Sequence, residues 1–306
     1  MLRALRAEAF LVLGALAFAF NGIVSKLVLA DGLSAWRLTQ IRCSGAFLIL
    51  LIYVAIRNWK SLLTTKVELP WLAAYGIIGF ALVQVGYFIA IGRMPISVAL
   101  IIEFTAPIWI VIYIRFIKKR FVPPMMWLSL ALGFSGLLLV GQVWKGLTLD
   151  GIGVIAAFLD AFALAAYFLL GEKLVASRST DTLTVWGLGF ASLVWTIATP
   201  VWSFPFTVFS EDVNLLGIFK EHTLPGWVLI TWIVVMGTIV PYLLILTGLK
   251  QLSASTSSVI GMLEPVIAGV IAWWWLDETF TAVQLIGGAV VIAGIILADR
   301  ARREAR

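Results

Sequence analysis

The sequence predicts an all-α membrane protein of ten transmembrane helices, arranged as two inverted five-helix repeats. The first observation is composition: of 306 residues, 62% are hydrophobic and only 12% are charged, an apolar content far above that of soluble domains. The second is the number of long apolar runs, and the third is a pattern that occurs twice. Connections between the runs are too short to fold alone, so we expect a single integral membrane domain over residues 1–306.

Ten apolar runs are long enough to cross a bilayer, whose core requires about 20 residues of helix. The first run follows charged residues and contains Ala17-Phe18-Ala19, as a cleaved signal peptide would. We assign it as a retained helix because the second half of the chain has a counterpart. An even number of spans leaves both termini on one side. The predicted spans are residues 8–29, 35–56, 70–91, 96–116, 124–143, 151–171, 183–203, 225–247, 254–275 and 281–298.

Basic residues indicate which side of these spans is cytoplasmic, because Lys and Arg are enriched in cytoplasmic loops. With the amino terminus inside, 16 of the 22 basic residues fall in cytoplasmic segments, whereas the longest outer loop, 203–224, carries Glu211, Asp212 and Glu221. We therefore expect a protein of the cell (inner) membrane with both termini cytoplasmic. The basic residues lie at helix ends rather than along one soluble face, so we expect no nucleic-acid partner.

One pattern occurs in both halves of the chain. Residues 90–140, shifted forward by 158, align with 248–298 without a gap, and Pro107 then overlays Pro265. Chance sharing of Pro and Gly by two apolar segments is the alternative explanation. We expect a first repeat over residues 7–143 and a second over 150–300.

The charge of one loop inverts between the repeats. The basic Lys118-Lys119-Arg120 overlays Leu276-Asp277-Glu278. Five helices are an odd number, so the second repeat must cross the membrane in the opposite direction, and a cytoplasmic loop becomes an outer one. Inverted repeats are typical of secondary transporters, with a substrate site near the membrane midplane between the halves.

Three stretches carry a family resemblance. They are "FNGIVSKLVLA" at 20–30, "RMPISVALIIEFTAPIWIVI" at 93–112 and "LEPVIAGVIAWWWLDETFTAVQLIGGAVVIAGIIL" at 263–297. With them the chain resembles the drug/metabolite transporter (DMT) superfamily, in its EamA-type branch of ten-helix transporters. The resemblance implies two inverted five-helix repeats, alternating access through a central cavity and, in many members, export of amino acids or related metabolites. "IEFTAP" at 102–107 is also similar to the branch of threonine and homoserine exporters.

Three carboxylates lie deep within predicted spans, where an ionised side chain costs roughly 2.5–3.5 kcal/mol and requires a partner or a water-filled cavity. Glu103 precedes Pro107 by one helical turn, and we expect it to bind a substrate amine or a proton, or to form a structural ion pair. Asp160 is expected to line the cavity or to make an interhelical hydrogen bond. Glu264, beside Pro265, is expected to contact the substrate or to hold a helix kink.

Other polar residues within the spans are further candidates for substrate binding or coupling. Arg42 either pairs with Glu103, which we favour, or clamps a substrate carboxylate through two hydrogen bonds. Asn21 suits a zwitterion or a packing hydrogen bond between helices. Helix packing is also the alternative role of the last four candidates, which are Gln84, Tyr87, Tyr167 and Tyr242. Helix kinks are predicted at Pro107, Pro241 and Pro265.

These observations favour a secondary transporter over other classes of membrane protein. The sequence contains no G-x-x-x-x-G-K-[ST] for ATP-driven pumping and no H-E-x-x-H for a metalloenzyme. We expect no cofactor, no metal and no catalytic residues. The expected partners are a small-molecule substrate and the lipid bilayer, with protons as the coupling ion. The alternative to an amino-acid exporter is a multidrug or lipophilic-cation exporter with an aromatic interior.

Overall fold

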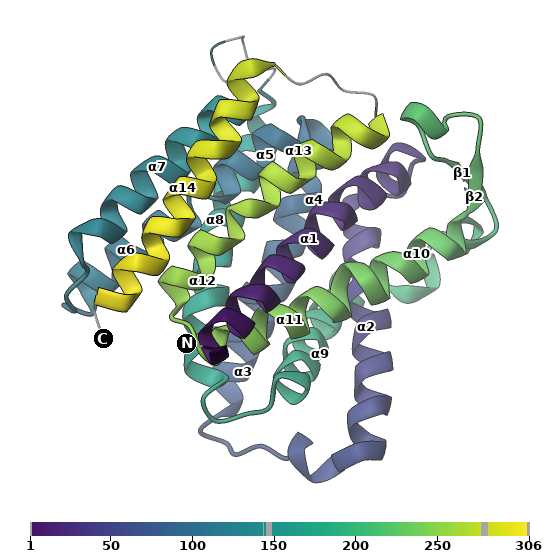
Figure 1. Ribbon diagram of the computed structural model, residues 1–306. Coiled ribbons are helices and arrows are strands. Elements are labelled where there is room, and N and C mark those ends of the chain that lie inside the picture. Colours follow the sequence, from purple (N-terminus) through teal and green to yellow (C-terminus); the bar gives the residue numbers. More distant parts are fainter. Residues whose placement is uncertain (1, 143, 145–148, 277–280, 305–306) are drawn as a thin grey trace.

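Helices make up almost the whole computed structural model, which describes residues 2–142, 144, 149–276 and 281–304 (Figure 1). Within these residues, nine helical stretches are long and apolar enough to cross a membrane, and Pro124–Val140 is a shorter apolar helix. Together they correspond to the ten predicted spans. The prediction of an all-α, ten-helix membrane protein is therefore confirmed.

Several spans are built from two shorter helices. The structure's α-helices are α1 Leu2–Ala30, α2 Ala35–Asn58, α3 Leu69–Gly76, α4 Val83–Arg93, α5 Ile96–Glu103, α6 Ala106–Ile112, α7 Pro124–Val140, α8 Gly151–Leu174, α9 Thr180–Ala198, α10 Gly226–Val234, α11 Val240–Leu249, α12 Ala254–Gly261, α13 Leu263–Leu276 and α14 Ala282–Glu304. Helix α9 ends five residues earlier than predicted, because Pro200 disfavours helical backbone at the residue before it.

The longest connection, between α9 and α10, contains a short β-hairpin. Strands β1 (Asp212–Asn214) and β2 (Thr223–Pro225) pair antiparallel, with Val213 opposite Leu224. The indole Nε1 of Trp275, near the end of α13, donates a hydrogen bond of 2.8 Å to the Leu215 carbonyl. The hairpin is thereby tied to the end of a transmembrane helix.

The third and eighth spans each contain a π-helical turn. Ile77–Leu82 joins α3 to α4, and Val235–Ile239 joins α10 to α11. Shifting 77 by 158 gives 235, so the two turns occupy corresponding places in the halves. A π-helical turn inserts one extra residue into an α-helix and is frequent at functional sites.

The fourth and ninth spans are each broken beside the proline where a kink was predicted. Helix α5 ends at Glu103 and α6 begins one residue before Pro107; α12 ends at Gly261 and α13 begins two residues before Pro265. Proline is tolerated in the first turn of a helix, because the N–H groups there have no intrahelical acceptor. Each helix break therefore places the proline where it destabilises the helix least.

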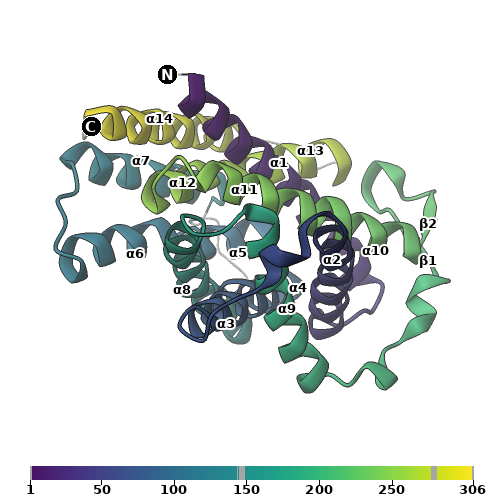
Figure 2. The same ribbon diagram turned by 90° about the horizontal axis from the view of Figure 1, so that it is seen from below.

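Helices α7 and α14 form a close seam in which two contacts are reciprocal. A Cβ built on Gly136 would lie 2.7 Å from the Gly287 carbonyl oxygen, and one built on Gly294 would lie 2.9 Å from the Ser129 carbonyl oxygen. The shift of 158 carries Ser129 to Gly287 and Gly136 to Gly294, so each contact is the other with its partners exchanged. Such reciprocity indicates a pseudo-two-fold relation between antiparallel helices, which lie side by side in Figures 1 and 2.

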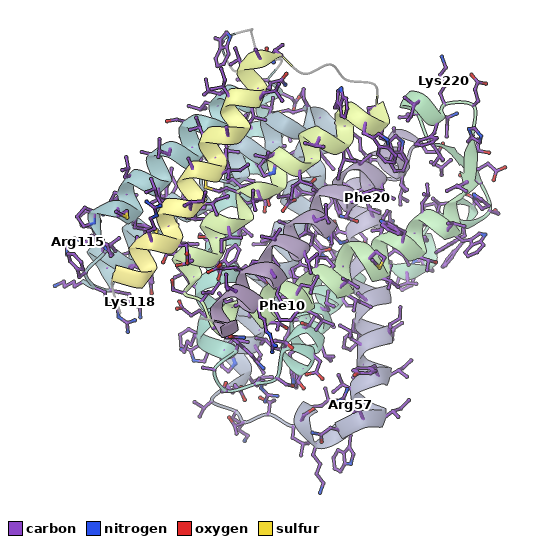
Figure 3. All side chains as sticks on the ribbon, in the orientation of Figure 1. Phe10, Phe20, Arg57, Arg115, Lys118 and Lys220 are labelled. Atoms are coloured by element: carbon purple, nitrogen blue, oxygen red, sulfur yellow. The ribbon has the colours of Figure 1, made fainter. Side chains whose placement is uncertain are left out.

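Charged residues lie at the two ends of the helix bundle. Both termini lie on the lower side of Figure 1, and the labelled Arg57 and Lys118 lie on that side in Figure 3. Lys220 lies at the opposite end, beside the hairpin (Figure 3). The acidic segment Asp277-Glu278, expected at that opposite end, falls outside the described residues.

Candidate functional site

A small cavity of about 60 Å³ lies between helices of both halves. At roughly 10–15 Å³ per water molecule, it has room for about five waters. Eight of the nine predicted binding or coupling residues line it: Asn21, Arg42, Gln84, Tyr87, Glu103, Tyr167, Tyr242 and Glu264. The sequence positions of these residues span α1 to α13, so the fold brings together side chains that the sequence analysis could place only by depth.

Asp160 is the exception. It is buried on α8 behind the cavity wall, where a Cβ built on Gly86 would lie 2.9 Å from its own Cβ. Neither carboxylate oxygen has a hydrogen-bond partner among the described residues, so the expected interhelical hydrogen bond is not seen. Its charge nevertheless lies within electrostatic range of Glu103 and Glu264. Asp160 therefore belongs to the electrostatics of the cavity without lining it.

Glu103 and Glu264 occupy opposite ends of the broken helices. Glu103 is the last residue of α5, and Glu264 is in the first turn of α13. Because a helix carries partial negative charge at its carboxyl end and partial positive charge at its amino end, the dipole of α5 disfavours a negative charge at Glu103, whereas the dipole of α13 favours one at Glu264. The Glu103 Oε2 atom is buried without a hydrogen-bond partner in the described part of the chain. These two carboxylates face the same space in unequal environments.

Arg42 does not make the direct ion pair with Glu103 that the sequence analysis favoured. Its Nε donates to the Thr238 hydroxyl at 2.6 Å, and its Nη2 donates to the Gly237 carbonyl. Pro241 explains the second bond, because proline has no N–H to donate to the carbonyl four residues earlier, which is that of Gly237. Arg42 thus satisfies a carbonyl in the π-helical turn and still lies within electrostatic range of Glu103 and Glu264.

Aromatic rings form much of the remaining wall. The ring centroids of Phe18 and Tyr242 are 5.2 Å apart, and the Arg42 guanidinium lies 5.9 Å from the Phe18 centroid, within cation–π range. Phe104 and Phe168 also line the cavity. These three phenylalanines were not predicted. Phe18 stands three residues before Asn21, so helical spacing from that candidate would have found it. Phe104 and Phe168 each directly follow a candidate and share no helix face with it, so spacing gives no signal for them.

The π-helical turns of the third and eighth spans each have a glycine at their third position, and this glycine packs against a side chain from the other half. A Cβ built on Gly79 would lie 3.2 Å from the Tyr167 Cβ on α8. One built on Gly237 would overlap the Asn21 side chain on α1. The shift of 158 carries Gly79 to Gly237. Asn21 and Tyr167 therefore fill corresponding places, and the cavity has a polar amide on one side and a phenol on the other.

Sequence comparison gives two matches to one family. The EamA-like transporter family matches residues 5–142 and again residues 151–298. The threonine/homoserine exporter RhtA of Escherichia coli (strain K12) is 25% identical over 274 residues, which cover 88% of this chain and 83% of that protein. The uncharacterized transporter YdfC of Bacillus subtilis (strain 168) is 24% identical over 293 residues, which cover 93% of this chain and 87% of YdfC.

The fold has a counterpart among solved structures. One crystal structure superimposes with a TM-score of 0.67 over 95% of this chain and 99% of the other, at 16% sequence identity. That likeness concerns the fold alone. The family resemblance read from the sequence motifs is confirmed by the two family matches. Since these matches leave out only the chain ends and a short connection, the protein belongs to the EamA-like transporter family and is a multi-pass membrane transporter.

Proposed function

We propose that this transporter exports amino acids or related small metabolites that carry an ammonium group, by alternating access through the central cavity. The observation that carries the proposal is the charge around the cavity. Glu103, Asp160 and Glu264 lie within electrostatic range of one another, and Arg42 is the cation near them. Three carboxylates against one guanidinium leave a deficit of positive charge in a low-dielectric space, which a cationic group or protons would relieve.

The arrangement suits a zwitterion better than a simple cation. The Arg42 guanidinium is held in place by Thr238 and Gly237, so its positive charge is preorganised for a substrate carboxylate. A substrate ammonium group would bind toward Glu103 and Glu264 on the other side. The relative RhtA, named a threonine/homoserine exporter, supports the same substrate class.

The place of the cavity supports alternating access. It lies between helices of both halves, so a relative movement of the halves would open it. We infer that the halves are inverted repeats, because the reciprocal contacts of α7 with α14 follow from that symmetry. Two inverted halves can exchange conformations, and the exchange opens the cavity first to one side of the membrane and then to the other.

Protons are the coupling ion in this proposal. Carboxyl groups that lie close together are not all ionised at once, because their charges repel. Protons and the substrate ammonium group therefore compete for the same carboxylate oxygens. Uptake of protons from outside would then displace the substrate outward. A second candidate function is export of lipophilic cations, which the aromatic wall of Phe18, Phe104 and Tyr242 favours.

Counterflow in proteoliposomes tests the proposal. Vesicles are loaded in turn with unlabelled threonine, homoserine, phenylalanine or a lipophilic cation, and entry of the same labelled compound is followed. We expect saturable exchange of an amino acid, lost in Glu103→Gln and Glu264→Gln but kept in Glu221→Gln, an exposed carboxylate of the outer loop. Exchange of the lipophilic cation alone would select the second candidate. If no compound exchanges with the folded protein, the proposed substrate class is wrong.

We also propose that both termini lie in the cytoplasm, at the inner membrane. The support is that 16 of 22 basic residues fall in the segments on the side of the termini. Labelling Lys118→Cys and Lys220→Cys in intact cells with a membrane-impermeant maleimide tests this orientation. The native Cys43 is buried, so background is low. Only Lys220→Cys should react; labelling of Lys118→Cys alone would reverse the orientation.

A further inference from the structure

A second, larger pocket lies at the end of the bundle that carries the termini. Its volume is about 650 Å³, within the 300–1,000 Å³ typical of ligand pockets. Its walls come from helix ends: the start of α3 at Trp71, the segment after α6, the end of α8, the start of α12 and Ala301 of α14. A pocket made of helix ends lies at the level of the membrane interface rather than at the midplane.

Three cations line this pocket, and two of them are held against aromatic rings. The Lys173 ammonium lies 3.0 Å from the ring centroid of Trp71, and the Lys118 ammonium lies 5.7 Å from that of Tyr113. The third is Arg120, and among the described side chains none of the three has a carboxylate within 4 Å. Rings orient the ammonium groups without neutralising their charge.

Among the described residues, the pocket wall contains one carboxylate. Glu172 lies near the backbone N–H of Ala254, the first residue of α12, and within electrostatic range of Arg120. Three cations against one carboxylate give the described residues of the pocket wall a net charge of +2. The charge selects an anion as the ligand.

Hydroxyl groups stand beside the cations. Ser253, Ser255 and Thr256 line the pocket at the start of α12, and the Ser253 hydroxyl oxygen lies 3.0 Å from that of Ser255 and 3.1 Å from that of Thr256. Such hydroxyls donate hydrogen bonds to phosphate oxygens, and the amino end of a helix favours negative charge. The chemistry of this wall is that of a phosphate site.

Apolar side chains complete the pocket and separate it from the central cavity. A helix turns by about 100° per residue, so Leu169 and Leu170 of α8, which line the pocket, project from a different face from Leu164 and Phe168, which line the cavity. Phe121 adds an exposed apolar ring to the pocket wall. The pocket therefore opens beside the transport route and offers an apolar surface next to its cations.

We propose that this pocket binds the phosphate headgroup of an anionic phospholipid, with an acyl chain against its apolar wall. Basic pockets between transmembrane helices at the interface recognise such headgroups. A free phosphate compound would share the headgroup chemistry but would leave the apolar wall unused. The inference does not depend on the transported substrate, since none of the cavity residues takes part.

Thermal unfolding of the purified full chain in neutral detergent tests the proposal, with titration by phosphatidylglycerol, phosphatidylcholine or inorganic phosphate. We expect phosphatidylglycerol to stabilise the protein at concentrations at least tenfold lower than the other two. Each interfacial cation contributes about fivefold in affinity, so Lys118→Gln with Lys173→Gln should weaken the response by about 25-fold. The charge-conserving pair Lys118→Arg with Lys173→Arg should keep most of it.

The matched control is Lys60→Gln with Lys66→Gln, which removes the same charge from a neighbouring loop outside this pocket. If the control pair loses as much of the stabilisation by phosphatidylglycerol as Lys118→Gln with Lys173→Gln does, the effect is one of overall charge, and the proposed site is wrong. An equal response to inorganic phosphate would overturn the lipid as the ligand. Native mass spectrometry of the unaltered protein gives an independent result: equal retention of phosphatidylglycerol and phosphatidylcholine would also overturn the proposal, even if the variants fail to fold.

Discussion

The α7–α14 seam and the central cavity are both buried between the two halves, yet they are built in opposite ways. In the seam, glycines bring backbones into contact, and the Ser129 hydroxyl donates to the Gly294 carbonyl at 2.7 Å. In the cavity, polar atoms of Gln84 and Glu103 are buried without hydrogen-bond partners among the described residues. Buried polar groups are normally satisfied, so each exception needs an explanation. The contacts of the seam are those of a structural contact, whereas in the proposed function the unsatisfied atoms of the cavity are the groups that a substrate or protons would engage.

The largest effect is expected in the seam, from Gly136→Val. A Cβ there would lie 2.7 Å from a backbone oxygen and a backbone nitrogen of α14, which cannot move aside as a flexible side chain can. Overpacking of a core costs about 1–3 kcal/mol, and backbone displacement costs more, so we expect little folded protein by size-exclusion chromatography. The control is Gly288→Ala, whose Cβ would make an ordinary contact of 3.4 Å with Val266. Normal folding of Gly136→Val would refute the structural role of the seam.

The second effect separates function from stability, and it comes from Glu103→Gln. The amide keeps the shape of the side chain but removes the charge that faces Arg42 and the other carboxylates. Losing a charged contact to a substrate costs roughly 2–5 kcal/mol, so we expect exchange in proteoliposomes to fall by at least about 30-fold. The melting temperature should stay the same or rise. A melting temperature lowered as far as that of Gly136→Val would place Glu103 among the structural residues.

Arg42→Lys is expected to have an intermediate effect on both properties. Lysine carries the charge but cannot donate in the fork geometry that reaches Thr238 and Gly237 together. One buried acceptor then loses its partner, at a cost of about 1–3 kcal/mol in the free energy of unfolding. Thermal unfolding with and without substrate measures this cost. The matched control is Arg57→Lys at the exposed end of α2, which should leave the unfolding temperature unchanged.

The sequence allowed the cavity to be predicted from depth alone, and its limits have physical causes. Glu103, Asn21 and Glu264 could be identified because a polar group within an apolar span demands a partner. The partner of Arg42 could not be identified, because the Gly237 carbonyl is 195 residues away and becomes available only through Pro241. A buried polar residue also need not line the cavity. Asp160 is buried like Glu103, but it packs against Gly86 of α4.

Apolar residues near the cavity show a different limit of prediction from the sequence. Phe80 is fully buried and its ring centroid lies 4.4 Å from that of Tyr242, yet a phenylalanine in an apolar run gives no signal of its own. The helix breaks were indicated by Pro107 and Pro265, whereas the π-helical turn at 77–82 contains no proline. The corresponding turn at 235–239 lies just before Pro241, where a kink was predicted, so the repeat is the one sequence signal that could have indicated the turn at 77–82.

The smallest effect lies outside the membrane, in the loop pair of Glu68 and Arg178. The Arg178 Nε donates to Glu68 at 2.6 Å, and this hydrogen bond holds the pKa of the Glu68 carboxyl below its usual value. Because the folded-state pKa of Glu68 is lowered, the ionised carboxyl stabilises the folded protein. This stabilisation is fully present above the unfolded-state pKa of about 4.3 and is lost as the pH falls through the folded-state pKa.

Glu68→Gln should therefore lower the unfolding temperature slightly at pH 7, by the equivalent of about 1 kcal/mol, because an amide replaces a carboxylate that accepts two hydrogen bonds from Arg178 in a partly exposed position. The difference between the variant and the unaltered protein should shrink below about pH 4, where the unaltered carboxyl also takes up a proton. A difference that grows in acid would mean that Glu68 gains stability by being protonated, which contradicts the ion pair. The pair ties a loop of the first half to a loop of the second half at one end of the bundle, so its effect is confined to stability and should leave exchange in proteoliposomes unchanged.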